Sequence, residues 1–414
     1  MHLERVLIVV EQRSQSDGGF AAFDLDNMEG PLKYCGMVDN IDVLYYRDYT
    51  PNCDEAVINY CTQEKPQAVL LSLQSMAARG GGLTPEAARK ITHQLQIPTA
   101  LFWFSIYADS IAELLERYLH SVSLNMILGA DASSHKTMLL EGTNYAYAFL
   151  TYNEELFNKP DGVRDIPVGL LGSLVPFRRQ WIEGLKESGI SVHTGGGQLV
   201  GNDTSFSTGK APLLWMPFEE YLRLTSRFKI VLNFSSGMGP THLPAVSFTG
   251  QAERSLVRLV SQVRAGLPAF IRNPSRWKDM VPAIKRVSSA SVKKPREMTR
   301  ARVLEALWCR TFLLEEYNPI TTRYFEPYVD YVPFTTLKDL VDKIRYYLEN
   351  DNERDRIRLQ GRATVEKYYN ARIYCENLFE AMGIPSDNQF QHHPGEIWNK
   401  AHFDNWYLSA STRQ

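Results

Sequence analysis

Short apolar runs rich in β-branched residues recur along the first third of the chain, and polar or amphipathic segments separate them. Each run is five or six residues long, which suits a strand buried on both faces better than a helix. The runs cover residues 6–10, 68–73, 99–104, 123–128 and 145–150. Strands that alternate with helices predict a parallel sheet with crossover connections, and therefore a Rossmann-like α/β domain.

Two of the segments between these runs carry helix signals. Thr84 is placed as an N-cap and Pro85 as a first-turn residue, ahead of a helix over residues 87–95. Within residues 110–119, leucine and isoleucine recur at helical spacing and so share one face of a second helix. Both segments fit as crossovers between parallel strands.

A polar stretch with proline and glycine at residues 158–162 interrupts this pattern, and a second series of the same kind follows it. A strand is predicted at 166–171, and a helix at 178–187. A further strand at 228–234 ends in a loop of small residues. The second series therefore predicts a second Rossmann-like domain.

These breaks predict three parts of the chain. Residues 1–160 form the first Rossmann-like domain, and residues 161–385 form the second, with an insertion at 240–300. Residues 386–414 form a helical tail whose aromatic side chains suggest that it packs back onto the body. After residue 350, a helix of about thirty residues is expected to end at Met382.

The bulk composition agrees with two globular domains. The chain has 414 residues, which suits two cores better than one. No apolar run approaches the roughly 18 residues of a membrane span, and the chain enters a strand-like run directly after its start, so no signal peptide is expected. Five scattered cysteines without metal-ligand spacing suggest reduced thiols in a cytoplasmic protein and no metal site.

The net charge of −2 conceals a strongly basic segment. Residues 253–302 hold thirteen Lys and Arg against three Asp and Glu, a local charge of +10. A block of this kind indicates an anionic partner, such as a diphosphate, a polyanion or a membrane surface. A solvated helical face that is balanced by acidic groups elsewhere explains the same block equally well.

The stretch from residue 300 to residue 316 carries the most specific signal. It reads as a charged helix start with Arg300, Arg302 and Glu305, then a short apolar helix and a buried strand. A Tyr-Phe-Glu-Pro loop and a long amphipathic helix over 336–348 follow. This order places the charged residues near the carboxyl ends of parallel strands, where α/β proteins bind nucleotides.

These residues resemble the nucleotide-binding half of GT-B glycosyltransferases of the retaining group 1 type, most closely the spore-maturation-protein type. The resemblance covers residues 165–235 and 300–380, including the strand–Gly–Ser–helix opening and the Asn-Phe strand. The chain departs from the family by Arg310 after Cys309, where glycine is usual, and by some sixty residues between the Asn-Phe strand and the motif helix.

The resemblance implies roles for two glutamates. Glu305 matches the second glutamate of the family's Glu-x7-Glu pattern, which holds the ribose hydroxyls of the nucleotide. Glu297 lies eight residues earlier, at the place of the first glutamate, and is predicted to be catalytic. On the residues alone, Glu305 could instead be a solvated charge at a helix start.

Several further residues are candidates for the donor diphosphate. Arg300 and Arg302 suit bidentate contact with phosphate oxygens, and the alternative for Arg302 is an ion pair with Glu305. Gly172 and Ser173 lie where a strand turns into a helix that contains Arg178. Exposed amides at such a turn favour an anion.

Strand ends elsewhere supply the remaining candidates. Asn233 and Ser235 end the second-domain strand at the level where nucleotides bind, although an ordinary strand-end turn is equally consistent. Gly18 and Gly19 follow the first strand, where the resemblance implies a glycine loop against the sugar and diphosphate. Asp131 follows another strand and is predicted to orient the acceptor hydroxyl or act as a base, or else to cap a helix.

The sequence therefore predicts a GT-B enzyme that moves a sugar from a nucleotide-sugar donor, UDP-linked, to a hydroxyl acceptor in a cleft between two domains. The resemblance implies transfer without a metal or other cofactor, and retention of anomeric configuration. The acceptor is open, and the basic segment at 253–302 suggests a polyanion such as modified DNA. A silent GT-B binding or assembly module and a nucleotide-sugar epimerase are the alternatives.

Overall fold

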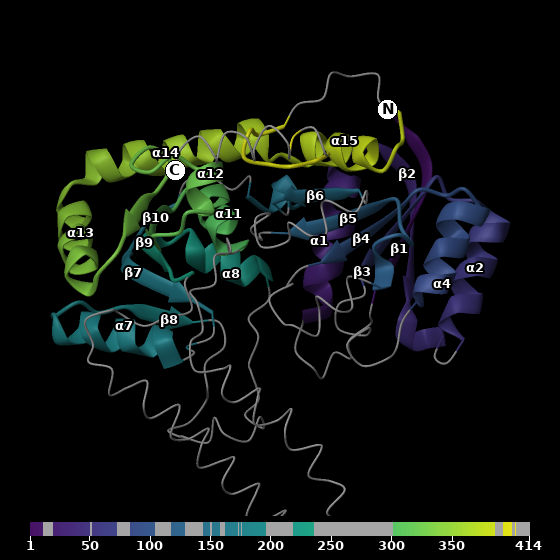
Figure 1. The fold of residues 1–414 in the computed structure, drawn as a ribbon. Coiled ribbons are helices and arrows are strands. Elements are labelled where there is room, and N and C mark those ends of the chain that lie inside the picture. The colour runs from purple at the N-terminus through teal and green to yellow at the C-terminus, as the bar shows by residue number, and fades with distance from the viewer. Residues whose placement is uncertain are drawn as a thin grey trace, which may run out of the picture.

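The structure is a computed structural model. The residues that it describes are 1–10, 20–49, 52–72, 83–103, 117–128, 144–149, 151–157, 162–172, 174, 176–195, 218–235, 301–385, 392–399 and 402. They form two parallel sheets that lie side by side, each covered by helices (Figure 1).

The first sheet has six strands in the order β2-β1-β3-β4-β5-β6. Its strands are β1 (Leu3–Val10), β2 (Val38–Tyr45), β3 (Ala68–Ser72), β4 (Thr99–Trp103), β5 (Leu124–Leu128) and β6 (Tyr145–Ala148). Its helices are α1 (Phe20–Cys35), α2 (Cys53–Glu64), α4 (Pro85–Arg89), which continues as a π-helical turn over Lys90–Gln94, and α15 (Ala371–Ala381). The predicted strands are all present, and Thr84 caps α4 by accepting from the Ala87 amide at 3.2 Å.

The apolar runs are continuous because both faces of this sheet are covered. Alternate residues of β1 point to opposite faces, so Leu7 and Val9 pack with α2 and α4. Val6 and Ile8 pack on the other face, with α1 and α15. The edge strand β2 is less buried and interrupted by polar residues, and its pattern is correspondingly weak in the sequence.

The second sheet has five strands in the order β11-β10-β9-β7-β8. Its strands are β7 (Ile166–Leu171), β8 (His193–Gly195), β9 (Phe228–Asn233), β10 (Phe312–Glu316) and β11 (Val332–Phe334). Its helices are α7 (Pro176–Glu187), α8 (Phe218–Thr225), α11 (Ala301–Trp308), α12 (Thr321–Tyr324), α13 (Leu337–Glu349) and α14 (Asp351–Tyr368). Helices α7 and α13 cover one face of the sheet, and α8, α11 and α14 cover the other.

The expected thirty-residue helix after residue 350 is wrong in one respect, because it is broken in two. The first helix ends at Tyr368 with Tyr369 as its C-cap, and Asn370 caps the second helix by accepting from the Ile373 amide at 2.9 Å. Helix α14 packs on the second sheet, whereas α15 packs on α1 of the first (Figure 1). The break thus carries the chain back across the junction between the domains.

The tail also returns to the first domain; residues 392–399 contain a turn and a β-bridge and no helix, His402 is helical, and the rest of the predicted helical tail lies outside the described residues. Ile397 forms an antiparallel bridge with Tyr147 of β6, and Trp398 is buried beside α15. The two backbone hydrogen bonds of this bridge pair N–H and C=O groups at the edge of β6 with the tail. Within the described ranges, no helix combines the length and apolar character needed to cross a membrane.

Candidate active site

Helix α11 starts at the carboxyl edge of the second sheet. It leads directly into β10 and must run antiparallel to that strand, so its first residues lie where β7 and β9 end. Residues 303–308 of this helix are all buried, which fixes it against the sheet and leaves only the first turn at the edge. Arg302 belongs to that first turn.

Two arginines converge on the turn that follows β7. Gly172 has a φ of +123°, and a β-carbon there would clash with Nη2 of Arg302 and lie 3.6 Å from Nη1 of Arg178. Glycine is therefore required both for the backbone conformation and for the space that the guanidinium of Arg302 occupies. Arg178 comes from the first turn of α7 and is also buried.

Asn233 connects Arg302 to the neighbouring strand. Nη1 of Arg302 donates to Oδ1 of Asn233 at 3.0 Å, and Nδ2 of Asn233 donates to Oε1 of Glu315 at 3.1 Å. Asn233 and Glu315 are register partners in β9 and β10, so their side chains point to the same face of the sheet. We call Gly172, Arg178, Asn233, Arg302 and Glu315 the strand-end cluster.

Glu315 is completely buried in this cluster. Its Oε1 also accepts from the Thr321 hydroxyl at 3.1 Å, whereas Oε2 has no hydrogen-bond partner among the described residues. Burial raises the pKa of Glu315 to about 8, and the nearby polar side chains of Thr321, Ser235 and Asn233 oppose that rise. At neutral pH the carboxyl group is therefore mostly protonated.

Glu305 lies one turn further along α11, in different surroundings. The Tyr152 hydroxyl donates to its Oε1 at 3.0 Å, and the Tyr221 hydroxyl donates to its Oε2 at 2.5 Å. Phe218 stacks on both tyrosine rings. Burial raises the pKa of Glu305, and the bonds from the tyrosines and the charge of Arg302 oppose that rise.

We call Glu305, Tyr152 and Tyr221 the tyrosine pocket. It joins the segment between the domains, which carries Tyr152, to α8 and α11 of the second domain. Glu305 is 7% exposed, so it is not a solvated charge at a helix start. Arg302 makes its hydrogen bond to Asn233, and so the ion pair with Glu305 that the sequence left open is not what orients it.

Apart from Glu305, the candidate residues therefore divide into three groups. Gly172, Arg178, Asn233 and Arg302 come together at one edge of the sheet. Ser235 lies at the same strand end, but its hydroxyl donates to the Glu316 carbonyl at 3.2 Å. The candidates that lie outside the described residues are Gly18, Gly19, Asp131, Ser173, Glu297 and Arg300, together with the basic segment up to residue 300.

Sequence reasoning missed Glu315 and the two tyrosines. The carboxylates that end the apolar run of β10 were a usable signal, because a buried glutamate needs partners. Nothing local marks Tyr152 or Tyr221, which lie 153 and 84 residues from Glu305 in the sequence.

Comparisons with known proteins identify the fold and one segment of the chain. Residues 253–380 match a family described as glycosyl transferase-like. HepE from Anabaena, solved with UDP-glucose, superposes with a TM-score of 0.54 at 10% identity, over 92% of this chain and 100% of that one. The fold is GT-B.

Two other solved structures are similar at lower scores. Sucrose-phosphate synthase from Thermosynechococcus elongatus has a TM-score of 0.48 at 10% identity, over 99% of this chain and 100% of that one. A glycosyltransferase from Rickettsia africae has a TM-score of 0.45 at 11% identity, over 94% and 100%. No curated protein sequence matches the chain.

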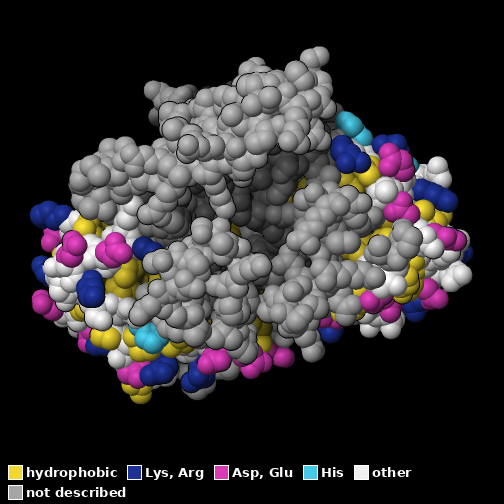
Figure 2. Space-filling view, turned by 90° about the horizontal axis from the view of Figure 1, so that it is seen from below, with side chains coloured by type: hydrophobic (Ala, Val, Ile, Leu, Met, Phe, Trp, Pro, Cys, Tyr) yellow, Lys and Arg dark blue, Asp and Glu magenta, His cyan; other side chains and the backbone are white. Residues whose placement is uncertain are grey.

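The predicted α/β architecture with two Rossmann-like GT-B domains is thus confirmed, and the chain carries a glycosyltransferase-like segment. The side of the GT-B body seen in Figure 2 mixes Lys and Arg with Asp and Glu over the described ends of both domains. In the described ranges, His, Cys, Asp and Glu do not gather in groups of three or more that could hold a metal ion.

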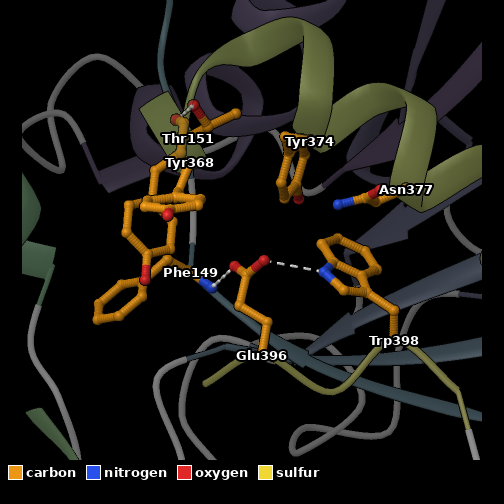
Figure 3. A pocket seen from close by; sticks show the side chains of 8 residues that line it. Phe149, Thr151, Tyr368, Tyr374, Asn377, Glu396 and Trp398 are labelled. Atoms are coloured by element: carbon orange, nitrogen blue, oxygen red, sulfur yellow. Dashed lines mark hydrogen bonds between the residues drawn. The ribbon is translucent and has the colours of Figure 1, made fainter. Parts of the chain in front are cut away.

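The two domains of the GT-B body meet at a joint around Glu396. Its Oε1 accepts from the Phe149 amide at 3.3 Å and its Oε2 accepts from Nε1 of Trp398 at 2.9 Å (Figure 3). Burial raises the pKa of Glu396 to about 7. Beside it, the Thr151 hydroxyl donates to the Tyr369 carbonyl at 2.8 Å, so the two segments that pass between the domains are tied together.

A hollow of about 360 Å³ lies at the edge of the second sheet opposite to the strand-end cluster. Leu222, Arg227 and Trp308 are among its lining residues, and Asp165 and Arg227 stand directly before β7 and β9. Ligands of open parallel sheets bind outside the carboxyl ends of the strands. The position of this hollow therefore separates it from the candidate active site.

Proposed function

We propose that the protein is a glycosyltransferase that takes a sugar from a UDP-linked donor and transfers it to a hydroxyl acceptor. The observation that carries this proposal is the convergence of Arg178 and Arg302 on Gly172 at the carboxyl end of β7. The resemblance of the fold to HepE, which was solved with UDP-glucose, makes UDP the first nucleotide to test.

The two arginines supply what the reaction requires. When the bond to the sugar breaks, negative charge develops on the departing diphosphate. Guanidinium groups that are already held in place, Arg178 buried and Arg302 half-buried, stabilise that charge without reorganising at the moment of reaction. The amides at the start of α11 lie at the same edge and add to the positive potential. We assign the neutralising charge to these groups and not to a metal ion.

Arg302 can donate further hydrogen bonds to a ligand. Its Nη1 is engaged by Asn233, while its Nε is buried and has no hydrogen-bond partner in the described part of the chain. A buried donor without a partner is unfavourable by about 1–3 kcal/mol. A phosphate oxygen that accepts from this atom would remove that cost, which favours an anionic ligand at this position.

Glu305 is assigned to the ribose of the donor. In the tyrosine pocket both carboxylate oxygens already accept hydrogen bonds. Each oxygen has more than one lone pair, so ribose hydroxyls can be added to these bonds or can replace one of them. The donor site therefore rests first on the arginines, and Glu305 contributes the second anchor.

Retention of anomeric configuration is part of the same proposal. It follows from Glu297 and Glu305, which reproduce the spacing of the retaining pattern. If Asp131 acted instead as a general base on the acceptor, the product would be inverted. The anomeric configuration of the first product, observed by NMR before mutarotation, separates the two assignments.

The acceptor is proposed to be an anion that binds the basic segment at residues 253–302. Phosphate contacts release counterions, so binding of a polyanion must weaken steeply as salt rises. Duplex DNA that carries hydroxymethylated bases is the first probe. An affinity that does not change between about 50 and 300 mM salt would exclude this class of acceptor.

Thermal shifts with a panel of nucleotide sugars test the donor assignment. We expect a UDP-sugar to raise the melting temperature of the wild type and of Arg227→Ala, but not of Arg302→Ala. Arg227 is a matched control, because it is paired with Asp165 at the opposite edge of the same sheet. If no nucleotide sugar shifts the wild type, the protein is a binding or assembly module.

A further inference from the structure

Glu315 lies behind the proposed diphosphate site and does not face solvent. It is fully buried at the end of β10, and its neighbours come from β9 and α12. A single side chain, Asn233, connects it to Arg302 through two hydrogen bonds. The hydrogen-bonded path from Glu315 to a bound diphosphate runs through Asn233 and Arg302.

The direction of the hydrogen bonds shows what Glu315 does to Asn233. A side-chain amide has one acceptor atom and one donor atom, and either can face Arg302 if nothing fixes the amide. Because Oε1 of Glu315 accepts from Nδ2, the oxygen Oδ1 is the atom that faces the guanidinium. The reversed amide would direct an NH2 group at a cation and lose the bond to Arg302.

The Thr321 hydroxyl donates to the same Oε1 and holds the carboxyl group in place. The path therefore runs from α12 through Glu315 and Asn233 to Arg302, with every member buried or held by a neighbour. Such a connected set of polar groups specifies one arrangement, because each reversal leaves a buried group without a partner.

We propose that Glu315 is a positioning residue for the donor diphosphate: through Asn233 it fixes the guanidinium of Arg302 beside Gly172. This role rests on the proposed function of the site. An apolar residue could not orient Asn233, and an ionised carboxylate would add negative charge next to a diphosphate. A carboxyl group that stays neutral at working pH meets both requirements.

Other charged and titratable groups around Glu315 are few in the described structure. Glu316 is its neighbour in β10 and raises its pKa further, and Tyr331 is close enough for the Glu315 charge to raise the pKa of its hydroxyl. Arg302 is the cation on the side of the site. A pH dependence of diphosphate binding that disappears in Glu315→Gln is therefore assigned to Glu315, because Gln imitates the neutral acid.

Calorimetric titration with UDP at pH 6.5 tests the proposal. We expect Glu315→Met to bind UDP about tenfold more weakly than the wild type, a change of about 1.4 kcal/mol. Glu315→Gln should stay within about twofold, because it keeps the acceptor atom. In the Asn233→Ala background, Glu315→Met should have no further effect, since residues that act through one path are not additive.

Glu396→Gln is the matched control, because Glu396 is another buried glutamate with a raised pKa but lies in the interdomain joint. Its UDP affinity should equal that of the wild type. Wild-type affinity for UDP in Glu315→Met, or additive losses in the double variant, would overturn the role of Glu315.

If Glu315→Met does not fold, the pH dependence of UDP affinity tests the proposal instead. Between pH 6.5 and 9 we expect wild-type UDP affinity to fall about fivefold as Glu315 ionises, while Glu315→Gln stays flat. Equal slopes in the two proteins would overturn the proposal.

Loss of UDP binding in Arg302→Ala, with Glu315 variants unchanged, refutes the role of Glu315 alone. A wild type that does not bind UDP at all removes the donor site and this role with it.

Discussion

The tyrosine pocket and the strand-end cluster are each built around a buried glutamate, and the two glutamates use their oxygens differently. In the tyrosine pocket each oxygen of Glu305 accepts from a different tyrosine. In the strand-end cluster one oxygen of Glu315 accepts two hydrogen bonds, and the other has no described partner. The first glutamate joins distant segments of chain, and the second orients a binding group.

The difference shows that the most recognisable residue of a motif need not be the cleanest probe of its function. Glu305 carries the resemblance to a ribose ligand, yet its substitution would also remove the acceptor of buried Tyr152 and of half-buried Tyr221. Arg302 makes one hydrogen bond within the described residues, to Asn233, so its removal disturbs fewer structural contacts than removal of Glu305. The comparison between the two regions can be tested by separating stability from donor affinity.

The largest effect expected is on the pH dependence of stability in the strand-end cluster. The pKa of Glu315 is raised to about 8 in the folded protein, so the folded state holds a proton that the unfolded chain loses near its ordinary pKa. Stability is therefore full at low pH and declines as pH rises towards 8. At about 1.36 kcal/mol per pKa unit, the decline assigned to Glu315 between its ordinary pKa of 4.5 and about 8 is of the order of 5 kcal/mol.

Urea unfolding at pH 5.5 and pH 8.5 measures this decline. Glu315→Gln should show a smaller loss than the wild type, while the contribution of Glu396, whose pKa is raised to about 7, remains in both proteins. Identical losses in the two proteins would mean that Glu315 does not hold its proton in the folded state.

Glu305→Ala should destabilise the protein by about 3 kcal/mol, because two buried hydroxyl groups lose their acceptor at about 1–3 kcal/mol each. The measurement is the free energy of unfolding in urea at pH 7. Tyr152→Phe with Tyr221→Phe in the same chain should remove most of the added cost of Glu305→Ala. An unchanged cost would show that the tyrosines are not what Glu305 stabilises.

Arg302→Ala should lower UDP affinity more than stability, the reverse of what we expect for Glu305→Ala. We expect UDP affinity to fall by about 100-fold, since charge-assisted hydrogen bonds contribute about 1.5–3 kcal/mol. Calorimetry gives the affinity, and circular dichroism at rising temperature gives the stability. A large loss of stability with unchanged affinity would place Arg302 with the structural residues instead.

Gly172→Ala should weaken UDP binding by about tenfold, the smallest of these effects, because the added methyl group occupies the place of the Arg302 guanidinium and can displace that flexible side chain. Gly189→Ala is the control, since its φ of +79° is also unusual but nothing lies within 4 Å of the added β-carbon. Both variants carry backbone strain, so only the difference between them reports the lost position of Arg302.

Much of the fold was predictable because parallel strands buried on both faces leave continuous apolar runs, as at residues 6–10. The break at Asn370 was missed because both flanking segments are good helices and only the cap separates them. Gly172, Arg178, Asn233 and Arg302 were identifiable from their places at strand ends and helix starts.

The partners of these residues were not predictable. The link between Asn233 and Glu315 depends on the register of β9 against β10, which the sequence of either strand does not contain. Tyr152 reaches Glu305 only because the segment between the domains folds back over α8 and α11. Long-range pairing of this kind is set by the assembled core and not by local pattern.

The return of α15 to the first domain has a consequence for how the protein is made. Met28 and Leu32 of α1 belong to the core that Leu378 and Phe379 of α15 complete. During synthesis from the N-terminus, that apolar face of α1 stays uncovered until α15 has been made. The first Rossmann-like domain is thus completed only after the second has been synthesised, so apolar surface is exposed in the partly folded chain.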